Sequence, residues 1–302
     1  MNKKVLIGPS SFAVLDSAPK ERLIKSGFEV IDNPFKRKLT KSELIELLPG
    51  VEGLIAGLET IDREALEKSD LKVISRCGSG LSNVDLVAAK DLGIKVCYTP
   101  FGPTTAVAEL TIGAMLSLIR MIPQMDYALH RGEWSKKIGF QLEGKTVAII
   151  GFGRIGRRVA ELLLPFKVKI IVVDSFLKET VDGYEILPLD EALPQADIIT
   201  IHSSGEECIL NTREFSLMET GVFLLNAARG GLISEEALLE ALREGKVAGA
   251  WLDTFTNEPY SGSLCQYQNV ILTPHIGSYT YECRRQMETE AVENLIKAFG
   301  DR

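Results

Sequence analysis

The segment from Lys145 to Asp174 restricts the fold more than any other part of the sequence. An apolar run at 146–150 leads directly into the glycine-rich turn Gly151–Gly156, and a helix-length segment then separates this turn from a second apolar run at 170–173. This order is typical of a strand, a tight turn, a helix and a second strand parallel to the first. We therefore expect a βαβ unit within a parallel sheet.

The three glycines of this turn have separate physical roles in binding a dinucleotide. Gly151 permits the tight turn, Gly153 lets a pyrophosphate approach the backbone, and Gly156 lets the helix pack closely on the sheet. A helix beginning near Arg154 and Ile155 would direct its free N–H groups and the positive end of its dipole at the phosphates. The turn therefore predicts a dinucleotide site.

The second strand of this unit ends in an acidic residue, Asp174, about 20 residues after the glycines, where a carboxylate accepts hydrogen bonds from a ribose diol and repels a 2′-phosphate. The next residues, 175–177, are Ser, Phe and Leu, so the arginine expected beside a 2′-phosphate is missing. We therefore expect NAD as the cofactor, although Lys178 leaves NADP open.

Composition excludes several other classes of protein. A chain of 302 residues suits two domains, and its net charge of -7 disfavours nucleic acid as a partner. The five cysteines are widely spaced without a CxxC pair, which predicts no disulfide framework, no metal site and a reducing cytoplasm. The N-terminus lacks the apolar core of a signal peptide, and the longest apolar stretch, 110–119, is too short to cross a bilayer. We expect no membrane role.

Strand-like and helix-like segments alternate twice along the chain, which predicts two α/β domains with parallel sheets. The first series of expected strands is at 4–8, 28–31, 53–56, 71–75 and 94–98, and the second is at 146–150, 170–173, 197–201, 222–225, 247–252 and 270–272. Helices are expected at 40–48, which opens with the capping-box spacing Thr40-x-x-Glu43, and at 83–91. The six later strands with a glycine turn match the doubly wound dinucleotide fold.

Two further helices are expected to connect these domains. An apolar helix at 103–122 ends at Pro123, and the following segment, 124–144, is either a connecting hairpin or a dimer contact. An amphipathic helix at 279–299 is expected to cross back and cap the first domain. We therefore predict a discontinuous substrate domain, 1–100 plus 277–302, and an NAD-binding domain, 101–276.

Three segments that follow late strands supply the groups for hydride chemistry on a carbonyl. Arg229 can bind a carboxylate and a carbonyl with its planar guanidinium, and His275 can remove or donate the hydroxyl proton. Glu258 can orient the imidazole and favour its charged form. A lone histidine is more often structural, but the presence of the other two groups favours catalysis. Together the three suit oxidation of a 2-hydroxy acid or reduction of a 2-oxo acid.

Six motifs in order resemble those of the D-isomer-specific 2-hydroxyacid dehydrogenase family, and most closely its D-3-phosphoglycerate dehydrogenases without a C-terminal regulatory domain. The matching motifs are 76–80 with 83–85, 106–111, 151–156, 228–231, 253–259 and 274–277. The resemblance implies two doubly wound parallel-sheet domains, a Rossmann NAD-binding domain and a flavodoxin-like substrate domain completed by the C-terminal helix. It also implies Arg229, Glu258 and His275 as the catalytic set.

The resemblance further implies residues for the cofactor and for the substrate. The cofactor residues are Ser79, Gly151, Gly153, Arg154, Ile155, Gly156, Asp174, His202, Ala227, Arg229, Asp253, His275 and Gly277. The substrate residues are Arg76, Gly78, Ser79, Gly80, Arg229 and His275, with the backbone N–H groups of 78–80 holding the carboxylate. Two of these have structural alternatives, since Asp253 can buttress its strand end and an isolated histidine such as His202 is typically structural.

The implied reaction joins 3-phosphoglycerate and phosphohydroxypyruvate in serine biosynthesis, with glyoxylate or hydroxypyruvate (glycerate) reduction as the alternative. The segment Ala56–Thr60 lacks the basic residues that members with a phosphorylated substrate often have there. Arg76 is the best remaining cation, while Arg37 and Lys38 would contribute only if their loop folds inward. A homodimer formed through Pro103–Gly144 is expected. An NAD-sensing regulator similar to the corepressors of the family is a competing hypothesis.

Overall fold

The computed structural model describes residues 2–177, 180–205 and 207–300. The chain forms two compact units. Unit 1 comprises Met1–Pro103 and Ser278–Arg302, and unit 2 comprises Thr104–Gly277.

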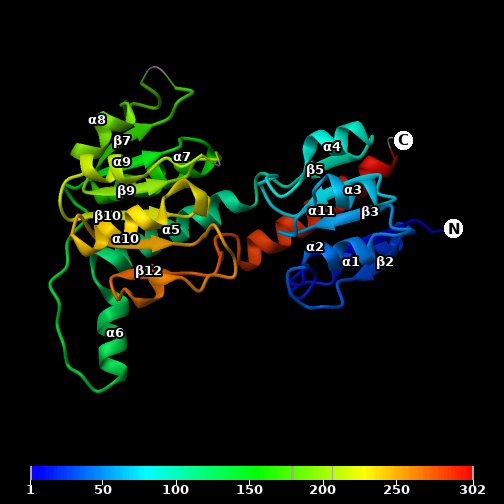
Figure 1. The fold of residues 1–302 in the computed structure, drawn as a ribbon, viewed down its shortest axis with the longest axis horizontal. Coiled ribbons are helices and arrows are strands. Elements are labelled where there is room, and N and C mark those ends of the chain that lie inside the picture. The colour runs from blue at the N-terminus through cyan, green and yellow to red at the C-terminus, as the bar shows by residue number, and fades with distance from the viewer. Residues whose placement is uncertain (1, 178–179, 206, 301–302) are drawn as a thin grey trace. The chain divides into compact units, whose positions relative to one another are not determined.

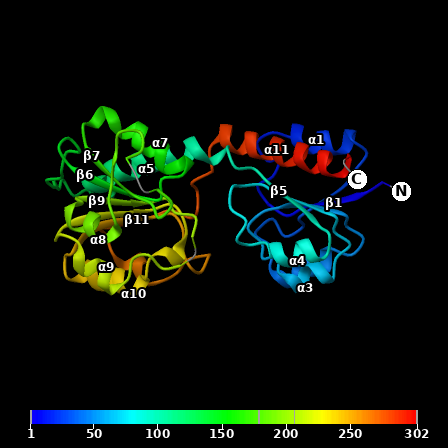
Figure 2. The same ribbon diagram turned by 90° about the horizontal axis from the view of Figure 1, so that it is seen from above.

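Unit 1 is a five-stranded parallel sheet with helices on both faces (Figures 1 and 2). Its elements are β1 (Lys4–Ile7), α1 (Ala18–Lys25), β2 (Glu29–Asp32), α2 (Lys41–Leu47), β3 (Gly53–Ala56), α3 (Arg63–Glu67), β4 (Val73–Arg76), α4 (Leu86–Asp91), β5 (Lys95–Tyr98) and α11 (Tyr281–Gly300). The strand order is β2-β1-β3-β4-β5, which is the flavodoxin-like order. The expected fold of this unit is confirmed.

Each face of the unit 1 sheet packs against its own helices. Leu6, Leu54 and Ile74 are fully buried in one core with α2, α3 and α4. On the other face lie α1 and α11 (Figure 2), and Ser75 Oγ donates to the Ala291 carbonyl at 2.7 Å. Gly53 permits this approach, because a Cβ there would lie 3.1 Å from Phe299. The C-terminal helix therefore completes unit 1.

Local signals in the sequence explain where the helices of unit 1 begin. The Thr40 hydroxyl accepts from the Glu43 N–H at 3.3 Å, and the Glu43 carboxylate accepts from the Thr40 N–H at 2.9 Å. This reciprocal pair is the predicted capping box and starts α2 at Lys41. Asp62 and Asp85 are the N-caps of α3 and α4. The side chain of each accepts one hydrogen bond, from the N–H of Ala65 and of Ala88 respectively.

Unit 2 is a seven-stranded parallel sheet between two helical layers (Figures 1 and 2). Its strands are β6 (Thr146–Ile150), β7 (Lys169–Val173), β8 (Glu185–Ile186), β9 (Ile198–Ile201), β10 (Val222–Asn226), β11 (Val247–Leu252) and β12 (Val270–Leu272). Its α-helices are α5 (Pro103–Ile119), α6 (Ile122–His130), α7 (Arg154–Leu163), α8 (Leu189–Ala192), α9 (Thr212–Leu217) and α10 (Glu235–Arg243). The order β12-β11-β10-β9-β6-β7-β8 contains the doubly wound Rossmann order.

Alternating side chains of the unit 2 strands form two separate cores. Val147 and Ile149 of β6 pack with α5 and α7, whereas Ala148 and Ile150 pack with the layer that contains α9 and α10. Successive side chains of a strand point to opposite faces, so a strand buried on both faces is apolar throughout. This explains the unbroken apolar runs of the sequence.

Three details of unit 2 differ from the sequence expectations. The two-residue strand β8 was not expected, because a strand so short has no periodic pattern. The helix expected at 103–122 ends at Ile119, since Met121 adopts a left-handed conformation (φ 52°) and a second helix, α6, begins at Ile122 with Pro123 in its first turn. The hairpin interpretation of 124–144 is wrong, because α6 fills the first part and residues 133–141 form neither helix nor strand.

Within the described ranges, no single helix is long and apolar enough to cross a membrane. Only α5 and α6 taken together pass such a test, with a bend of 66° between them.

Candidate active site

The glycine turn after β6 lies at the point where the strand order of unit 2 reverses. β6 pairs with β7 on one side and with β9 on the other, so Asp174 and His202 follow the strands that flank the turn. In open α/β sheets this crevice at the carboxyl ends of the strands is where ligands bind.

Each glycine of the turn is needed for a different geometric reason. Gly151 has φ +92°, and a Cβ there would lie 2.6 Å from the Ser203 nitrogen. A Cβ on Gly156 would lie 2.2 Å from the Gly151 carbonyl oxygen, so only glycine lets α7 pack this closely. In contrast, no atom of the described residues lies within 4 Å of a Cβ built on Gly153. Gly153 therefore borders open space, where a phosphate can approach the backbone.

The start of α7 and the end of β7 complete this cradle. Gly153 is the N-cap of α7 and has no side chain to cap it, and Arg154 and Ile155 are the first residues of the helix. Asp174 is half-buried, and its carboxylate accepts from the Phe152 N–H at 2.8 Å and from the Phe176 N–H at 2.9 Å. An uncapped helix N-terminus beside open backbone, with a fixed carboxylate near it, fits a dinucleotide. Lys178 lies outside the described residues.

His202 follows β9 behind the glycine turn. Its Nε2 lies 2.9 Å from Thr200 Oγ1, and its Nδ1 is buried without a hydrogen-bond partner among the described residues. Burial lowers the pKa of His202 to about 3, because the charged imidazolium loses its hydration there. The imidazole is therefore neutral in the folded protein at neutral pH.

This histidine gives the folded protein a specific pH dependence. Its pKa is about 3 when folded and 6.5 when unfolded, so the unfolded state binds more protons and stability falls as pH decreases below 6.5. At pH 5 we expect a loss of about 2 kcal/mol in the free energy of unfolding from this group. Chemical denaturation at pH 7.5 and pH 5 measures it, and His202→Gln should reduce the difference by that amount. An equal pH dependence in both proteins would contradict the assignment.

The three segments predicted to carry the chemistry follow adjacent strands. Asn226 of β10 lies opposite Leu252 of β11, and Leu252 lies opposite Leu272 of β12. The loops that begin at these residues hold Arg229, Glu258 and His275, so all three belong to one edge of the unit 2 sheet. The structure therefore brings the three segments to the same end of three neighbouring strands.

Asn226 shapes the loop that presents Arg229. Its amide donates to the Arg229 carbonyl at 2.8 Å and its side-chain oxygen accepts from the Ala228 N–H at 3.0 Å, so the half-buried Ala227 lies within a closed turn. Gly230 touches the neighbouring loop, since a Cβ there would lie 2.0 Å from the Phe255 carbonyl carbon. The arginine backbone is therefore fixed on both sides.

Asp253 holds the turn that carries His275. Its Oδ1 accepts from Thr273 Oγ1 at 2.6 Å and from the Ile276 N–H at 2.8 Å, and its Oδ2 accepts from the Gly277 N–H at 2.8 Å. Asp253 is 1% exposed, and burial raises its pKa, against the opposing effect of these hydrogen bonds. The structure thus shows the buttressing role for Asp253, and contact with a cofactor stays a prediction.

His275 and Glu258 form the central pair of the site. Their Nδ1 and Oε2 atoms are 3.0 Å apart, and both side chains are partly exposed. The Glu258 carboxylate also accepts from the Phe255 N–H at 3.1 Å, which fixes it on its own loop. Because Nδ1 is bonded to the carboxylate, Nε2 is the ring nitrogen that this contact leaves for a ligand. His275 has φ +53°, a conformation that is rare outside glycine and is maintained by the Asp253 bonds on either side.

The predicted substrate residues of unit 1 lie immediately after β4. The Arg76 guanidinium packs over Gly78, whose φ is +148°, and donates to the Cys77 carbonyl. The Gly78 N–H donates to Thr99 Oγ1 at 2.7 Å, whereas Ser79 is exposed and Gly80 is half-buried. The loop is thus anchored at Gly78 and open at Ser79. These residues belong to a different unit from His275 and Glu258, and their role stays a prediction.

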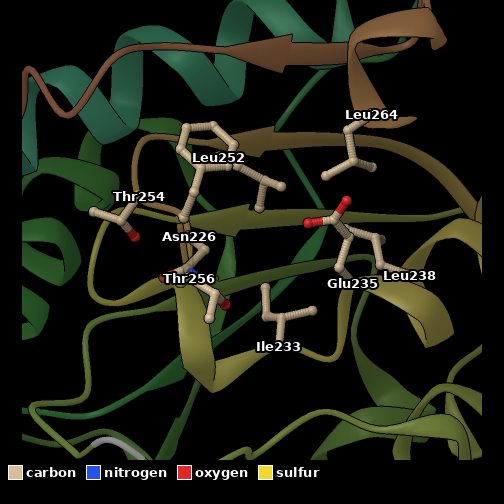
Figure 3. A pocket seen from close by; sticks show the side chains of 10 residues that line it. Asn226, Ile233, Glu235, Leu238, Leu252, Thr254, Thr256 and Leu264 are labelled. Atoms are coloured by element: carbon tan, nitrogen blue, oxygen red, sulfur yellow. The ribbon is translucent and has the colours of Figure 1, made fainter. Parts of the chain in front are cut away.

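A small pocket of unit 2 lies beside the Arg229 loop but contains none of the predicted site residues. Figure 3 shows Asn226, Thr254 and Thr256 on one side of it and Leu238, Leu264 and Glu235 on the other. Glu235 accepts from Tyr260 Oη at 2.6 Å. The pocket therefore separates α10 from the loop that leads to Glu258.

Sequence reasoning gave no role to two residues that position the site, Asn226 and Thr273. Asn226 closes the Arg229 turn, and Thr273 accepts from Trp251 Nε1 at 3.0 Å while donating to Asp253. Both are polar residues at the end of an apolar strand, which is the signal that could have identified them.

Comparison with known proteins decides the family. Residues 112–277 match the model of the NAD-binding domain of the D-isomer specific 2-hydroxyacid dehydrogenases, which covers more than half of the chain. The chain belongs to this family. The resemblance drawn from the six motifs is therefore confirmed, and unit 2 contains the NAD-binding domain of the family.

Individual relatives agree with this assignment. Human D-3-phosphoglycerate dehydrogenase is 39% identical over 97% of this chain, and the match covers 56% of the human protein. The chain thus spans little more than half the length of that relative. Hydroxypyruvate reductase of Thermotoga maritima is 40% identical, with 87% of this chain and 89% of the relative covered. The crystal structure of the TT0316 protein from Thermus thermophilus has a TM-score of 0.90 and 34% identity, with 99% and 97% of the two chains covered.

Proposed function

We propose that the protein is an NAD-dependent oxidoreductase that transfers a hydride between nicotinamide and C2 of a small D-2-hydroxy or 2-oxo acid. The observation that carries the proposal is the 3.0 Å bond between His275 and Glu258 in the unit that matches the NAD-binding domain of the family. When bound, NAD supplies the hydride acceptor or donor. The protein must then bind the acid and move one proton.

The side chains divide this work. His275 Nε2 removes the hydroxyl proton during oxidation and returns it during reduction, while Glu258 holds Nδ1 and stabilises the imidazolium. Arg229 binds the substrate carboxylate and carbonyl, because its planar guanidinium makes two parallel hydrogen bonds. In unit 1, the loop Gly78–Gly80 binds the carboxylate through the backbone N–H groups of Ser79 and Gly80, because the Gly78 N–H already donates to Thr99 Oγ1. Unit 1 is thus proposed as the substrate domain and unit 2 as the NAD domain.

Two substrates are supported by different observations. The phosphoglycerate dehydrogenase relatives support 3-phosphoglycerate and phosphohydroxypyruvate, and with them a role in serine biosynthesis. The hydroxypyruvate reductase relative and the absence of a cation in Ala56–Thr60 support hydroxypyruvate or glyoxylate.

Steady-state oxidation of NADH tests the function directly. We expect turnover with at least one of phosphohydroxypyruvate, hydroxypyruvate and glyoxylate. If none of these acids is reduced while NADH still binds, the enzyme proposal fails and the NAD-sensing regulator becomes the better account.

Asp174 should determine the choice of NAD over NADP. Replacing it by serine removes the carboxylate that repels a 2′-phosphate, so we expect the kcat/KM ratio of NADPH to NADH to rise by about tenfold or more. Steady-state kinetics with both cofactors measure the ratio. Glu219→Ser, at an exposed position just after α9, is the control and should leave the ratio unchanged. An unaltered ratio in Asp174→Ser would refute the role.

We also propose that the chain forms a homodimer through the segment Pro103–Gly144. This segment exposes large apolar side chains, among them Trp134, which is 79% exposed, and Ile138, which is 93% exposed. Exposed apolar surface of this kind is typical of an interface. The double variant Trp134→Asp and Ile138→Asp should be monomeric by light scattering at micromolar concentration, whereas the unmodified protein should be a dimer. A monomeric unmodified protein would refute the proposal.

A reducing, cytoplasmic location is proposed because Cys77, Cys208, Cys265 and Cys283 are free thiols.

A further inference from the structure

A buried carboxylate occupies the carboxyl edge of the unit 1 sheet. Glu59 follows β3 by three residues and is 1% exposed. It accepts from the Gly57 N–H at 2.8 Å, and a Cβ on Gly8, just after β1, would lie 2.2 Å from its Oε1. The carboxylate therefore lies between the ends of β1 and β3, at the edge where ligands of open α/β sheets bind.

The cations near this edge act on Glu59. Arg76 and Lys38 both lie close enough to favour its ionised form, although burial raises the pKa of Glu59 overall. Arg76 extends over Gly78, at the start of the candidate substrate loop. Arg37 is directed away, because it pairs with Glu43 at the start of α2. An ionised Glu59 would therefore offset the positive charge of Arg76 and weaken its attraction for an anionic ligand at this edge.

The fold does not require a charge at this position. Asn33 donates to the Gly8 carbonyl at 2.7 Å, and Asn83 donates to the carbonyls of Gly57 and Glu59 at 3.1 and 2.7 Å. These bonds fix the loops after β1 and β3 together with the bond from the Gly57 N–H to Glu59, which the oxygen of a glutamine could accept as well. A buried ionised group is costly unless it is compensated, and an amide of the same shape would fill the same space. A glutamate at this position, whose ionised form Arg76 and Lys38 favour against the effect of burial, is therefore better explained by selection among ligands than by folding.

We propose that Glu59 determines the substrate class by rejecting acids whose distal end, away from the carboxylate and the reacting carbon, carries a phosphate. The substrates selected are small 2-hydroxy or 2-oxo acids with an uncharged distal end. This inference rests on the proposed dehydrogenase function and on the role of the loop Gly78–Gly80. Under this proposal, the charge of Glu59 favours hydroxypyruvate and glyoxylate as substrates over 3-phosphoglycerate and phosphohydroxypyruvate.

The first test uses the unmodified protein with NADH. Hydroxypyruvate and phosphohydroxypyruvate differ only in the distal phosphate. We expect kcat/KM to be higher for hydroxypyruvate by about tenfold or more. This is the scale of the repulsion between two unit charges about 10 Å apart at an effective dielectric constant of about 20. A preference for phosphohydroxypyruvate would overturn the inference but leave the proposed function intact. Absence of turnover with every 2-oxo acid would overturn both.

The second test removes the charge but keeps the shape. Glu59→Gln should raise the kcat/KM ratio of phosphohydroxypyruvate to hydroxypyruvate by about tenfold. Glu67→Gln removes the same formal charge from the exposed surface of unit 1 and should leave the ratio unchanged. An equal ratio in Glu59→Gln and the unmodified protein would overturn the inference. If Glu59→Gln does not fold, the comparison of the two substrates on the unmodified protein decides the matter alone.

Discussion

Replacing His275 by asparagine should lower kcat for 2-oxo acid reduction by about a hundredfold or more, which is the scale of general acid–base catalysis. Asparagine can retain a hydrogen bond to Glu258 but cannot deliver a proton from the position of Nε2. The dissociation constant of NADH should remain nearly the same, because the glycine turn and Asp174 that form the cradle lie on other strands. Steady-state kinetics and fluorescence titration with NADH measure the two effects separately.

The matched control for this variant is His130→Asn. His130 ends α6, its side chain is 80% exposed, and its nearest acidic partner is Asp126 at 3.5 Å. The same substitution there should change neither kcat nor NADH binding. A His275→Asn enzyme with unchanged turnover would show that the proton is carried by another group.

Gly156→Ala should destabilise the protein more than Gly153→Ala. The Cβ at 156 would lie 2.2 Å from the Gly151 carbonyl oxygen, and such overpacking costs about 1–3 kcal/mol. Because this Cβ would meet backbone, the cost should lie near the upper end of that range. The helix propensity of alanine returns up to about 1 kcal/mol, so the net loss in the free energy of unfolding should be about 2 kcal/mol. A Cβ at 153 meets no described residue within 4 Å, so that variant should lose only the smaller cost of alanine at an N-cap, about 0.5–1 kcal/mol.

The affinity for NADH should also distinguish Gly153→Ala from Gly156→Ala. Gly153→Ala places a methyl group in the open space that a pyrophosphate would use, so it should weaken NADH binding without unfolding the protein. Chemical denaturation and NADH titration are the two measurements. If Gly153→Ala bound NADH as tightly as the unmodified protein, the assignment of the phosphate position would be wrong.

The sequence predicted the fold well where its pattern is periodic or its glycines are required. The strands β6 and β7 and the turn between them were placed within one residue, because apolar runs and the spacing of Gly151 and Gly156 follow from sheet geometry. The capping box of α2 was predicted for the same reason, since its two hydrogen bonds need particular side chains at a fixed spacing. Such signals are local and need no knowledge of the tertiary structure.

Features that depend on tertiary contacts were missed. The break between α5 and α6 depends on the left-handed conformation of Met121, which is uncommon for a residue of this type. β8 has two residues and exists only through its pairing with β7. The residues that support the site, Asn226 and Thr273, act through hydrogen bonds to loops that are close in space, so the sequence pattern alone gave them no role.

The pair proposed to be catalytic was predicted from chemistry, and its geometry came from the structure. Glu258 and His275 are 17 residues apart and lie on different loops, so their 3.0 Å contact depends on the pairing of β11 with β12. The buried Glu59 shows the opposite case. Its position after β3 was known as part of a segment without cations, but only the packing between Gly8 and Gly57 reveals a carboxylate at the edge of the sheet.

Deuteride transfer from NADH that carries deuterium at both C4 positions of the nicotinamide tests the central claim most directly. With hydroxypyruvate as the acceptor, the account predicts D-glycerate with deuterium at C2, and a loss of this product by about a hundredfold or more in His275→Asn. An L-product, a product without deuterium, or full transfer in the variant would contradict it.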